Sequence, residues 1–495
     1  MSSPSKPLAE QSAATQATEV SLLDQIVSRG RFGKDTVARE AGKDLVKEFI
    51  NQVLEGKMTL TRDAEATIGT RIAEIDRLVS QQLNEVIHHP SFQQLEATWR
   101  GVHQLVTQSK TGEMLKIKLL NAPKRDLVRD FRRFGPKEQD QCALYKKVHD
   151  EEFGVFGGTP FGALVGDYEF GRGAEDVELL ERIAGVAAVA HAPFLSAAAP
   201  ELLNLENYTQ LSGIKSIESV FGPTQYARWR SFRESEDSRY VALTLPHVLM
   251  REPYGKEGRK IEEFAFEEEV DGKDHSKYLW GNAAYALAGR LTESFEKFGW
   301  CASIRGVENG GLVEGLPTHN FSTDDGELAM KCPTEVQIIE SRERELAEHG
   351  FVSLVHRKNE SDAVFFSVQT VNRPKKWDTP EANANARLSA QLPYILAVSR
   401  FAHFLKVMMR DKIGGTMSRP QAEQFLNRWI RQYVLADDNA LPNAKAEKPL
   451  RDAKIEVVEI PGKPGVLRAV AFLRPHFQLD ELTVALRLVA DVPNK

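Results

Sequence analysis

The sequence has few cysteines and no excess of basic charge. Each of these features argues against some classes of protein. Three cysteines, Cys142, Cys301 and Cys332, occur in 495 residues, and none forms a C-x-x-C pair. This usage is typical of a reducing compartment, where thiols stay unpaired. The formal net charge is −6. A dedicated nucleic-acid or anionic-membrane binder carries a strongly basic face, so the composition argues against both classes.

Segments that direct a chain out of the cytoplasm are also missing. The first 20 residues are polar, are expected to be disordered, and contain no apolar core of a signal peptide. The most apolar stretch, residues 183–199, contains His191 and Pro193. It is shorter than the roughly 20 residues that a membrane span needs. We therefore expect a cytoplasmic chain with no membrane insertion, in which residues 183–199 are buried core.

None of the strong catalytic signatures is present. The sequence has no Walker A loop, no G-x-S-x-G, no H-E-x-x-H and no EF-hand spacing. The glycines of residues 305–315 invite a phosphate-loop interpretation, but without a strand–G-x-G-x-x-G–helix context a structural loop is favoured. The acidic block at residues 261–275 fits no metal loop, so a solvated hairpin is favoured. We expect no cofactor and no metal; an enzyme with an unrecognised site near residues 305–335 is the rival interpretation.

A short amphipathic segment follows the polar N-terminus. Within residues 21–30, Ser21 can cap a helix and Gly30 can end it. One apolar stripe is formed by Leu22, Leu23, Ile26 and Val27. Isolated helices need about 12–15 residues to form in water. The segment therefore has to dock, and two interpretations stay open: it packs on its own chain, or it is presented to a partner.

Residues 36–109 show the periodicity of three amphipathic helices. Apolar residues recur every three or four positions, the second helix stops at Pro90, and the third starts at Ser91. The resulting helical layer is small, which leaves room for helices from another chain.

From Met114 onward, strand and helix patterns alternate. Strands are expected at residues 114–122, 163–165, 168–170, 239–246, 300–306 and 363–371, and helices at 124–134, 139–153, 174–190 and 278–298. This alternation predicts a mixed α/β or α+β body.

The C-terminal region combines helices with three strands. A helical stretch at residues 382–434 precedes strands at 454–460, 466–474 and 482–490. The last strand carries Leu482, Val484, Leu486 and Leu488 on one face. A chain that ends in an apolar strand either pairs it within its own domain, the commoner case, or lends it to a neighbour.

A basic cluster lies in the same region. Residues 399–434 contain seven basic side chains and two acidic ones. The basic residues are Arg400, Lys406, Arg410, Lys412, Arg419, Arg428 and Arg431. A solvated face and a face that meets an acidic partner are both compatible with this charge.

Several long blocks resemble the large subunit of the contractile sheath of type VI secretion systems, a family related to phage tail sheath proteins. The blocks include HHPSFQQLEATWRGV (88–102), EEFGVFGGTPFGALVGDYEF (151–170), RGVENGGLVEGLPTH (305–319), KCPTE (331–335) and LRPHFQLDELTVALRLVA (473–490). They run in order over nearly the whole chain, so the resemblance is specific.

The resemblance implies a structural protein of α+β fold without a catalytic site. Family members pair with a small sheath subunit, and the heterodimers polymerise into a helical tube around an inner tube. The sheath grows from a baseplate, contracts to drive the inner tube out, and is taken apart by a Clp-type AAA+ unfoldase. A contractile tail sheath of a phage-derived device is the alternative within the same class of assembly.

The resemblance also implies roles for segments of this chain. Four domains are expected: a tail with a partner-binding helix (1–35), a helical outer domain (36–113), a mixed sheath domain (114–375) and a C-terminal core (376–495). The stripe Leu22, Leu23, Ile26 and Val27 matches the unfoldase-binding segment. Leu482, Val484, Leu486 and Leu488 match the strand exchanged between subunits. Arg410, Lys412, Arg428 and Arg431 are candidates for the surface that faces the inner tube.

Overall fold

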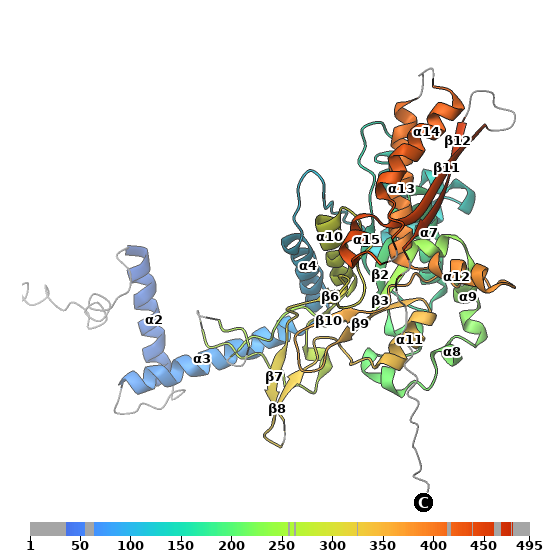
Figure 1. Ribbon diagram of the computed structural model, residues 1–495. Helices are drawn as coiled ribbons and strands as arrows, with labels where there is room; N and C mark the ends of the chain where they lie inside the picture. The colour runs from blue at the N-terminus through green and yellow to red at the C-terminus, as the bar shows by residue number, and fades with distance from the viewer. Residues whose placement is uncertain are drawn as a thin grey trace, which may run out of the picture. The chain divides into compact units, whose positions relative to one another are not determined.

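The computed structural model of the chain (Figure 1) describes two compact units. Of the described residues, 36–54, 64–83 and 264–266 belong to the smaller unit, and the others to the larger. The described residues are 36–54, 64–255, 258–261, 264–323, 325–412, 417–437, 439–459, 467–476 and 478. The predicted segment 21–30 and the predicted strand 482–490 lie outside these residues, so both stay predictions.

The smaller unit contains helix α2 (Thr36–Leu54) and most of helix α3 (Ala64–Ile87). Both confirm the periodicity of the sequence. The apolar stripe of α3 is uncovered: Ile68, Ile72, Ile75 and Val79 are 43–54% exposed. Val37 and Leu45 of α2 are more exposed still. An amphipathic helix that leaves such a stripe in water lacks the surface that would bury it.

A six-stranded sheet forms the centre of the larger unit, in the order β1-β2-β3-β9-β10-β6. The strands are β1 (Leu164–Phe170), β2 (Phe194–Ala198), β3 (Val241–Leu245), β9 (Phe351–His356), β10 (Ala363–Phe365) and β6 (Leu312–Val313). The first four are parallel, and β10 and β6 add antiparallel neighbours. Parallel strands are stable when both faces are covered, and the near-continuous apolar residues of β2 and β3 fit that position.

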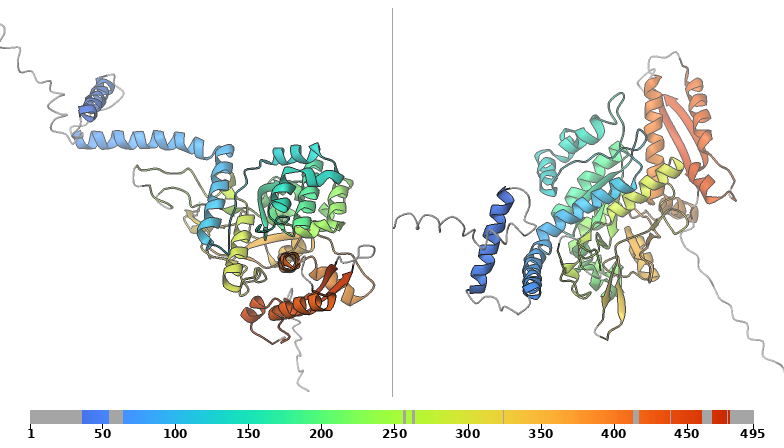
Figure 2. Two further views of the ribbon diagram at one scale, coloured as in Figure 1. Left: turned by 90° about the horizontal axis from the view of Figure 1, so that it is seen from above. Right: turned by 90° about the vertical axis from the view of Figure 1, so that its left-hand side faces the viewer.

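Helices cover both faces of this sheet (Figures 1 and 2). One face packs on α5 (Lys124–Arg133), α7 (Ala174–Ala190) and α9 (Ala227–Glu234), and the other on α4 (Pro90–Gln108) and α10 (Ala284–Phe298). Alternate strand residues enter the two cores: Val241 and Leu243 join the α7 side, and Ala242 joins the α10 side. A Cβ at Gly101 would overlap the Tyr285 ring, so glycine is what lets α4 approach α10 closely.

A separate layer is built from helices α13 (Leu392–Asp411) and α14 (Arg419–Ile430) and the hairpin of β11 (Leu450–Glu459) and β12 (Leu467–Pro475). Its core stacks Trp300 on Phe401, with ring centroids 4.4 Å apart. Within the described part of the chain, α13 is the one helix long and apolar enough to cross a membrane. Its Leu392 packs in the sheet core and its Phe401 in the hairpin core, so α13 is the helix that joins these two cores.

Shorter elements complete the larger unit. They are α6 (Ala143–Tyr145), α8 (Ile217–Val220), α11 (Glu340–Glu348), α12 (Pro380–Leu388), α15 (Pro442–Glu447), β4 (Val248–Leu249), β5 (Trp280–Gly281), β7 (His319–Ser322) and β8 (Leu328–Lys331).

The mixed helix and sheet fold agrees with the sequence, but several predicted elements were wrong. Residues 114–122 and 300–306 form no strand, because neither segment pairs with another strand of the described chain. Residues 139–153 break into a 3-10 turn, an α turn and a π turn, not one helix. The helix expected at 278–298 begins only at Ala284, and the strand expected at 363–371 ends at Phe365. The two strands expected at 163–170 are one, with an irregular register between Val165 and Glu169.

A buried charge network holds the loops beside α4. Arg251 donates two hydrogen bonds to Glu268, at 2.6 and 3.0 Å, and a third to Glu96 of α4 at 2.9 Å. The Arg251 and Glu268 side chains are 5% and 1% exposed. Glu268 lies in the acidic block that the sequence predicted to be a solvated hairpin, so that prediction was wrong for this residue. Its carboxylate is held by charge pairing inside the fold.

A second, partly buried network surrounds His247. Its Nδ1 atom lies 2.5 Å from Glu335 Oε2, and its Nε2 atom lies 3.0 Å from Glu169 Oε1. Burial acts to lower the pKa of His247, but the two carboxylates outweigh it and raise the pKa to about 10. The imidazolium therefore links the end of β1 to the segment after β8 throughout the neutral pH range.

We expect Glu268→Gln to destabilise the larger unit by about 3 kcal/mol, because it removes the carboxylate that accepts two of the three hydrogen bonds that the buried Arg251 donates to Glu268 and Glu96. The measurement is the shift of the urea unfolding midpoint of the full-length chain, followed by tryptophan fluorescence. The adjacent Glu269→Gln is the matched control, since Glu269 is 75% exposed in its pair with Lys277 and exposed pairs contribute below about 1 kcal/mol. Equal effects of the two substitutions would contradict the network.

Candidate assembly surfaces

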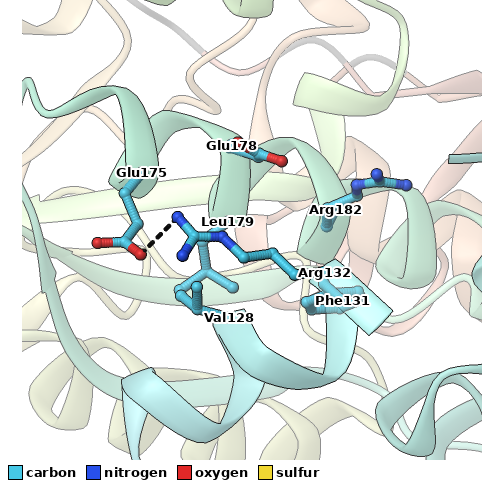
Figure 3. Close-up of a pocket in the computed structure, with 7 residues that line it drawn as sticks. All are labelled: Val128, Phe131, Arg132, Glu175, Glu178, Leu179 and Arg182. Atoms are coloured by element: carbon cyan, nitrogen blue, oxygen red, sulfur yellow. Dashed lines mark ion pairs between the residues drawn. The ribbon is translucent and has the colours of Figure 1, made fainter. Parts of the chain in front are cut away.

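A small pocket lies between α5 and α7 (Figure 3) and encloses about 10 Å³. The ion pair between Arg132 and Glu175, 2.8 Å long, spans it. A cavity needs at least about 10–15 Å³ to hold one water molecule, so this pocket is too small to enclose a substrate.

A larger cavity of about 220 Å³ lies among loops near β7. It is lined by Pro253, Tyr254, Gly255, Gly258, Glu267, Glu268, Val270 and His319. The carboxylate of Glu268 is already paired with Arg251, which removes it as a free acid or base. Across the residues that the structure describes, no three His, Cys, Asp or Glu side chains are placed to hold a metal ion.

The glycine-rich loop at residues 305–315 is structural. The N–H of Gly306 donates to Phe365 O at 2.7 Å, and the N–H of Gly311 donates to Gly306 O at 2.8 Å. A phosphate loop needs backbone N–H groups that point at a ligand. These two are used within the chain to hold the loop against β10.

Helix α14 closes one edge of the β11–β12 hairpin with side chains. Asn427 donates to Ile455 O at 2.6 Å and accepts from Ile455 N at 3.0 Å. Two residues on, Arg419 Nε donates to Val457 O at 2.6 Å, and Glu423 accepts from Val457 N at 3.1 Å. At Ile455 and Val457, the main-chain groups that β11 turns away from β12 are therefore occupied.

The opposite edge of the hairpin is left open. In an antiparallel pair, residues that do not bond to each other direct their N–H and C=O groups to the two outer edges. Ile455 and Val457 face Ala471 and Ala469 in the register, so these alanines direct their main-chain groups away from β11. In the described chain, no strand pairs with β12 on that side. An open edge of this kind is a template for a strand from another chain.

The hairpin has one apolar, buried face and one polar, solvent-exposed face. Ile455 and Val457 are buried against α14, in the same core as Ala469, Ala471 and Leu473. The other face carries Arg468, Lys454 and Glu456, with Phe472 55% exposed. A strand added beside β12 would continue both faces, which requires a donor with alternating apolar and polar residues.

The predicted basic surface is divided. Arg410 donates to Val155 O at 2.8 Å and lies over the Phe156 ring, and the Lys412 ammonium lies over the Phe425 ring. Lys406 and Arg400 lie in the same way over Phe153 and Phe404. Lys406, Arg410 and Lys412 thus contact segments outside α13, whereas Arg400 and Phe404 belong to the same helix.

By contrast, Arg428 and Arg431 lie exposed at the end of α14 and the turn after it. Arg410 is half-buried, whereas Lys412, Arg428 and Arg431 are exposed, and of these three Lys412 lies over an aromatic ring. Their proposed role toward an inner tube stays a prediction.

Helix α4 presents a second uncovered surface. Its buried side, with Ala97 and Leu105, faces the larger unit. Its outer side carries Phe92, Leu95 and Trp99, which are 39%, 55% and 61% exposed. These positions lie on one helical stripe, and exposed aromatic side chains in a row mark an interaction surface.

Sequence reasoning missed the residues that seal β11. Their signal is present: residues 419, 423 and 427 recur every four positions and so share one side of α14. A row of polar residues at this spacing normally indicates a solvent-exposed face of a helix. The sequence alone therefore does not reveal that this row of α14 contacts a strand.

Two family models match the chain in succession. Residues 69–372 match the EvpB/VC_A0108 tail sheath N-terminal domain, and residues 381–492 match the EvpB/VC_A0108 tail sheath gpW/gp25-like domain. The type VI secretion system sheath protein TssC1 of Pseudomonas aeruginosa strain PAO1 is 46% identical over 458 residues, which cover 92% of each chain.

Two solved structures share a weaker likeness. The baseplate of the anti-feeding prophage aligns with 64% of this chain and 66% of its own, at 11% identity and a TM-score of 0.34. The contracted helical sheath of the same device aligns with 63% of this chain and 67% of its own, at 12% identity and a TM-score of 0.30. Scores this low do not by themselves show a common fold.

We expect Asn427→Ala to open the sealed edge of β11, because it removes both partners of Ile455. A buried main-chain group left unpaired costs about 1–3 kcal/mol. Amide hydrogen exchange at Ile455 should therefore speed up, while exchange at the paired residue Glu456 changes less. The control is Gln424→Ala, on an exposed position of the same helix. Unchanged exchange at Ile455 would show that the side chain does not seal this edge.

Proposed function

Because the chain belongs to the family of type VI secretion tail sheath proteins, we propose that it is the large structural subunit of a contractile sheath. It pairs with a small sheath subunit, and the pairs polymerise into a helical tube around an inner tube. Contraction of the sheath drives the inner tube and its effectors outward. The work of the protein is mechanical, and it needs no cofactor and performs no catalysis.

The observation that carries this proposal is the hairpin with one sealed edge and one open edge. Main-chain hydrogen bonds to an added strand join two chains firmly, and they need no particular side chain at the edge. The segment after β12 ends in the apolar pattern of Leu482, Val484, Leu486 and Leu488. We propose that this segment is lent to the open edge of a neighbouring subunit.

The uncovered helices support pairing with a small subunit. The stripes of α2, α3 and α4 expose apolar side chains that a second set of helices would bury. We propose that residues 36–113 form an outer helical domain completed by the partner. Residues 114–375 and 376–495 then form the two sheath domains.

The exposed arginines support a contact with the inner tube. Arg428 and Arg431 lie on the outside of the hairpin layer, where they would meet an acidic tube surface. Arg410 and Lys412, named with them from the sequence, contact Val155, Phe156 and Phe425. We therefore propose that Arg410 and Lys412 contribute less to binding of the inner tube than Arg428 and Arg431 do.

The remaining parts of the proposal come from the sequence. The stripe Leu22, Leu23, Ile26 and Val27 is presented to a Clp-type AAA+ unfoldase that dismantles the contracted sheath. The sheath grows from a baseplate in the cytoplasm. The identity to a type VI sheath protein favours this system over a phage-derived tail.

Truncation before Leu482 tests whether the C-terminal segment is donated to a neighbouring subunit. The shortened chain should still co-purify with its small partner subunit, because the helical stripes are intact, but it should form no sheath tubes in electron micrographs. Normal tubes from this variant would refute strand exchange.

A pair of prolines tests the receiving edge. Ala471→Pro removes an outward N–H group and should block tubes while the hairpin stays folded, since proline is tolerated on the free side of an edge strand. Val470→Pro removes an N–H that bonds to β11 and should also unfold the hairpin. If tubes formed as readily with Ala471→Pro as with the unmodified chain, β12 would not be the receiving edge.

Replacing Leu23 and Ile26 with Asp tests the unfoldase segment. The apolar stripe is lost, so capture by the unfoldase should fall below detection in a pull-down of contracted sheaths. Tube assembly should be unchanged, because we propose that this segment meets the unfoldase and not a neighbouring subunit. Loss of tubes would show that the stripe has a structural role instead.

A further inference from the structure

Residues 115–122 form an extended segment without a neighbouring strand. They contain no helix, turn or bend, and no sheet of the described chain includes them. Among the described residues, no group forms a hydrogen bond with the main-chain N–H or C=O groups of residues 116–121. The sequence of this segment has the pattern of a strand, and the function proposed above gives it no role.

Side chains hold this segment in place. Ile117 packs against the apolar side chains that join α4 to α10. Lys118, which points to the opposite face of an extended chain, forms an ion pair with Glu152. At the end of the segment, the carbonyl oxygen of Ala122 accepts a hydrogen bond from the Tyr168 hydroxyl. Both faces therefore contact the larger unit while the main chain stays unpaired, as in a strand at the edge of a sheet.

Apolar side chains of the segment are left uncovered. Met114, Leu119 and Leu120 are 81%, 67% and 54% exposed. An exposed, apolar, extended main chain is a template for pairing with another strand, and natural proteins protect or cover such edges. The uncovered leucines therefore indicate that a second chain completes this part of the surface.

The charge of the segment indicates the chemistry of that chain. Residues 114–125 contain no acidic residue and four basic ones, which are Lys116, Lys118, Lys124 and Arg125. Lys118 and Lys124 form ion pairs within the chain, whereas Lys116 and Arg125 are exposed. A second copy of the same segment would place like charges opposite one another, which is destabilising, whereas opposite charges in cross-strand pairs are stabilising. The basic residues therefore favour an acidic strand.

We propose that residues 115–121 receive a β-strand from another protein chain, in which acidic residues alternate with apolar ones. The added strand forms hydrogen bonds with the free main-chain groups of residues 116–121. Its acidic side chains lie on the face of Lys116, and its apolar side chains lie on the opposite face with Leu119. This site is separate from β12, and the inference does not depend on the sheath function.

The test measures amide hydrogen exchange of the full-length chain by mass spectrometry. The probe is a synthetic peptide of about nine residues, within the usual length of a strand, in which Glu alternates with Val. The matched control peptide has Lys in place of each Glu. The acidic peptide should slow exchange within residues 116–121 several-fold, because it occupies their N–H groups, and the basic peptide should leave this exchange unchanged.

Two charge reversals test the recognition of acidic residues. Lys116→Glu should weaken binding of the acidic peptide several-fold, because it replaces an attractive cross-strand pair with a repulsive one. Lys215→Glu is the control, since Lys215 is exposed and lies outside the segment. Equal loss of affinity in the two variants would overturn the role of Lys116.

The unmodified chain decides the proposal itself. Unchanged exchange within residues 116–121 at saturating acidic peptide would overturn it, and so would equal protection by the acidic and basic peptides. No sheath subunit or inner tube enters this experiment, so its failure would leave the proposed sheath function standing.

Discussion

The N–H and C=O groups at the edges of a strand need partners, and this constraint shapes the C-terminal layer. Helix α14 satisfies it for β11 with Arg419, Glu423 and Asn427. Nothing in the described chain satisfies it for β12. The other parts of the layer fix the position of the hairpin. Helix α13 and the stacked rings of Trp300 and Phe401 pack it against the sheet domain.

Rigidity inside the larger unit comes from buried charge as well as apolar packing. Arg251 and Glu268 fix the long loops beside α4, and His247 joins the end of β1 to Glu335. Buried pairs of this kind add little net stability relative to apolar packing, but breaking one is costly. Loops tied in this way stay fixed to the sheet, which suits the role in a contracting sheath that we propose.

Sequence periodicity predicted the helices and strands that depend on local residues. The predictions failed where the structure of a segment depends on residues far away in the sequence. The three helices of residues 36–109 and the strands of the hairpin follow from periodicity alone. Residues 114–122 have a strand-like pattern, yet the described chain contains no neighbouring strand for them. Glu268 sits in an acidic block, and its burial depends on partners that the local pattern does not reveal, such as Arg251, 17 residues away in sequence. The seal on β11 was missed for the same reason, since a polar row on α14 does not name the strand that it meets.

The asymmetry of the hairpin has a consequence for the direction of any polymer built through it. The receiving edge and the proposed donor segment are different parts of the chain, so a one-way donation makes a head-to-tail contact. Repeated contacts of this kind form a ring if the rotation closes and an open filament if it does not. An open filament then has two chemically distinct ends, one with vacant edges and one with unused donor segments, and growth at the first is a different reaction from growth at the second.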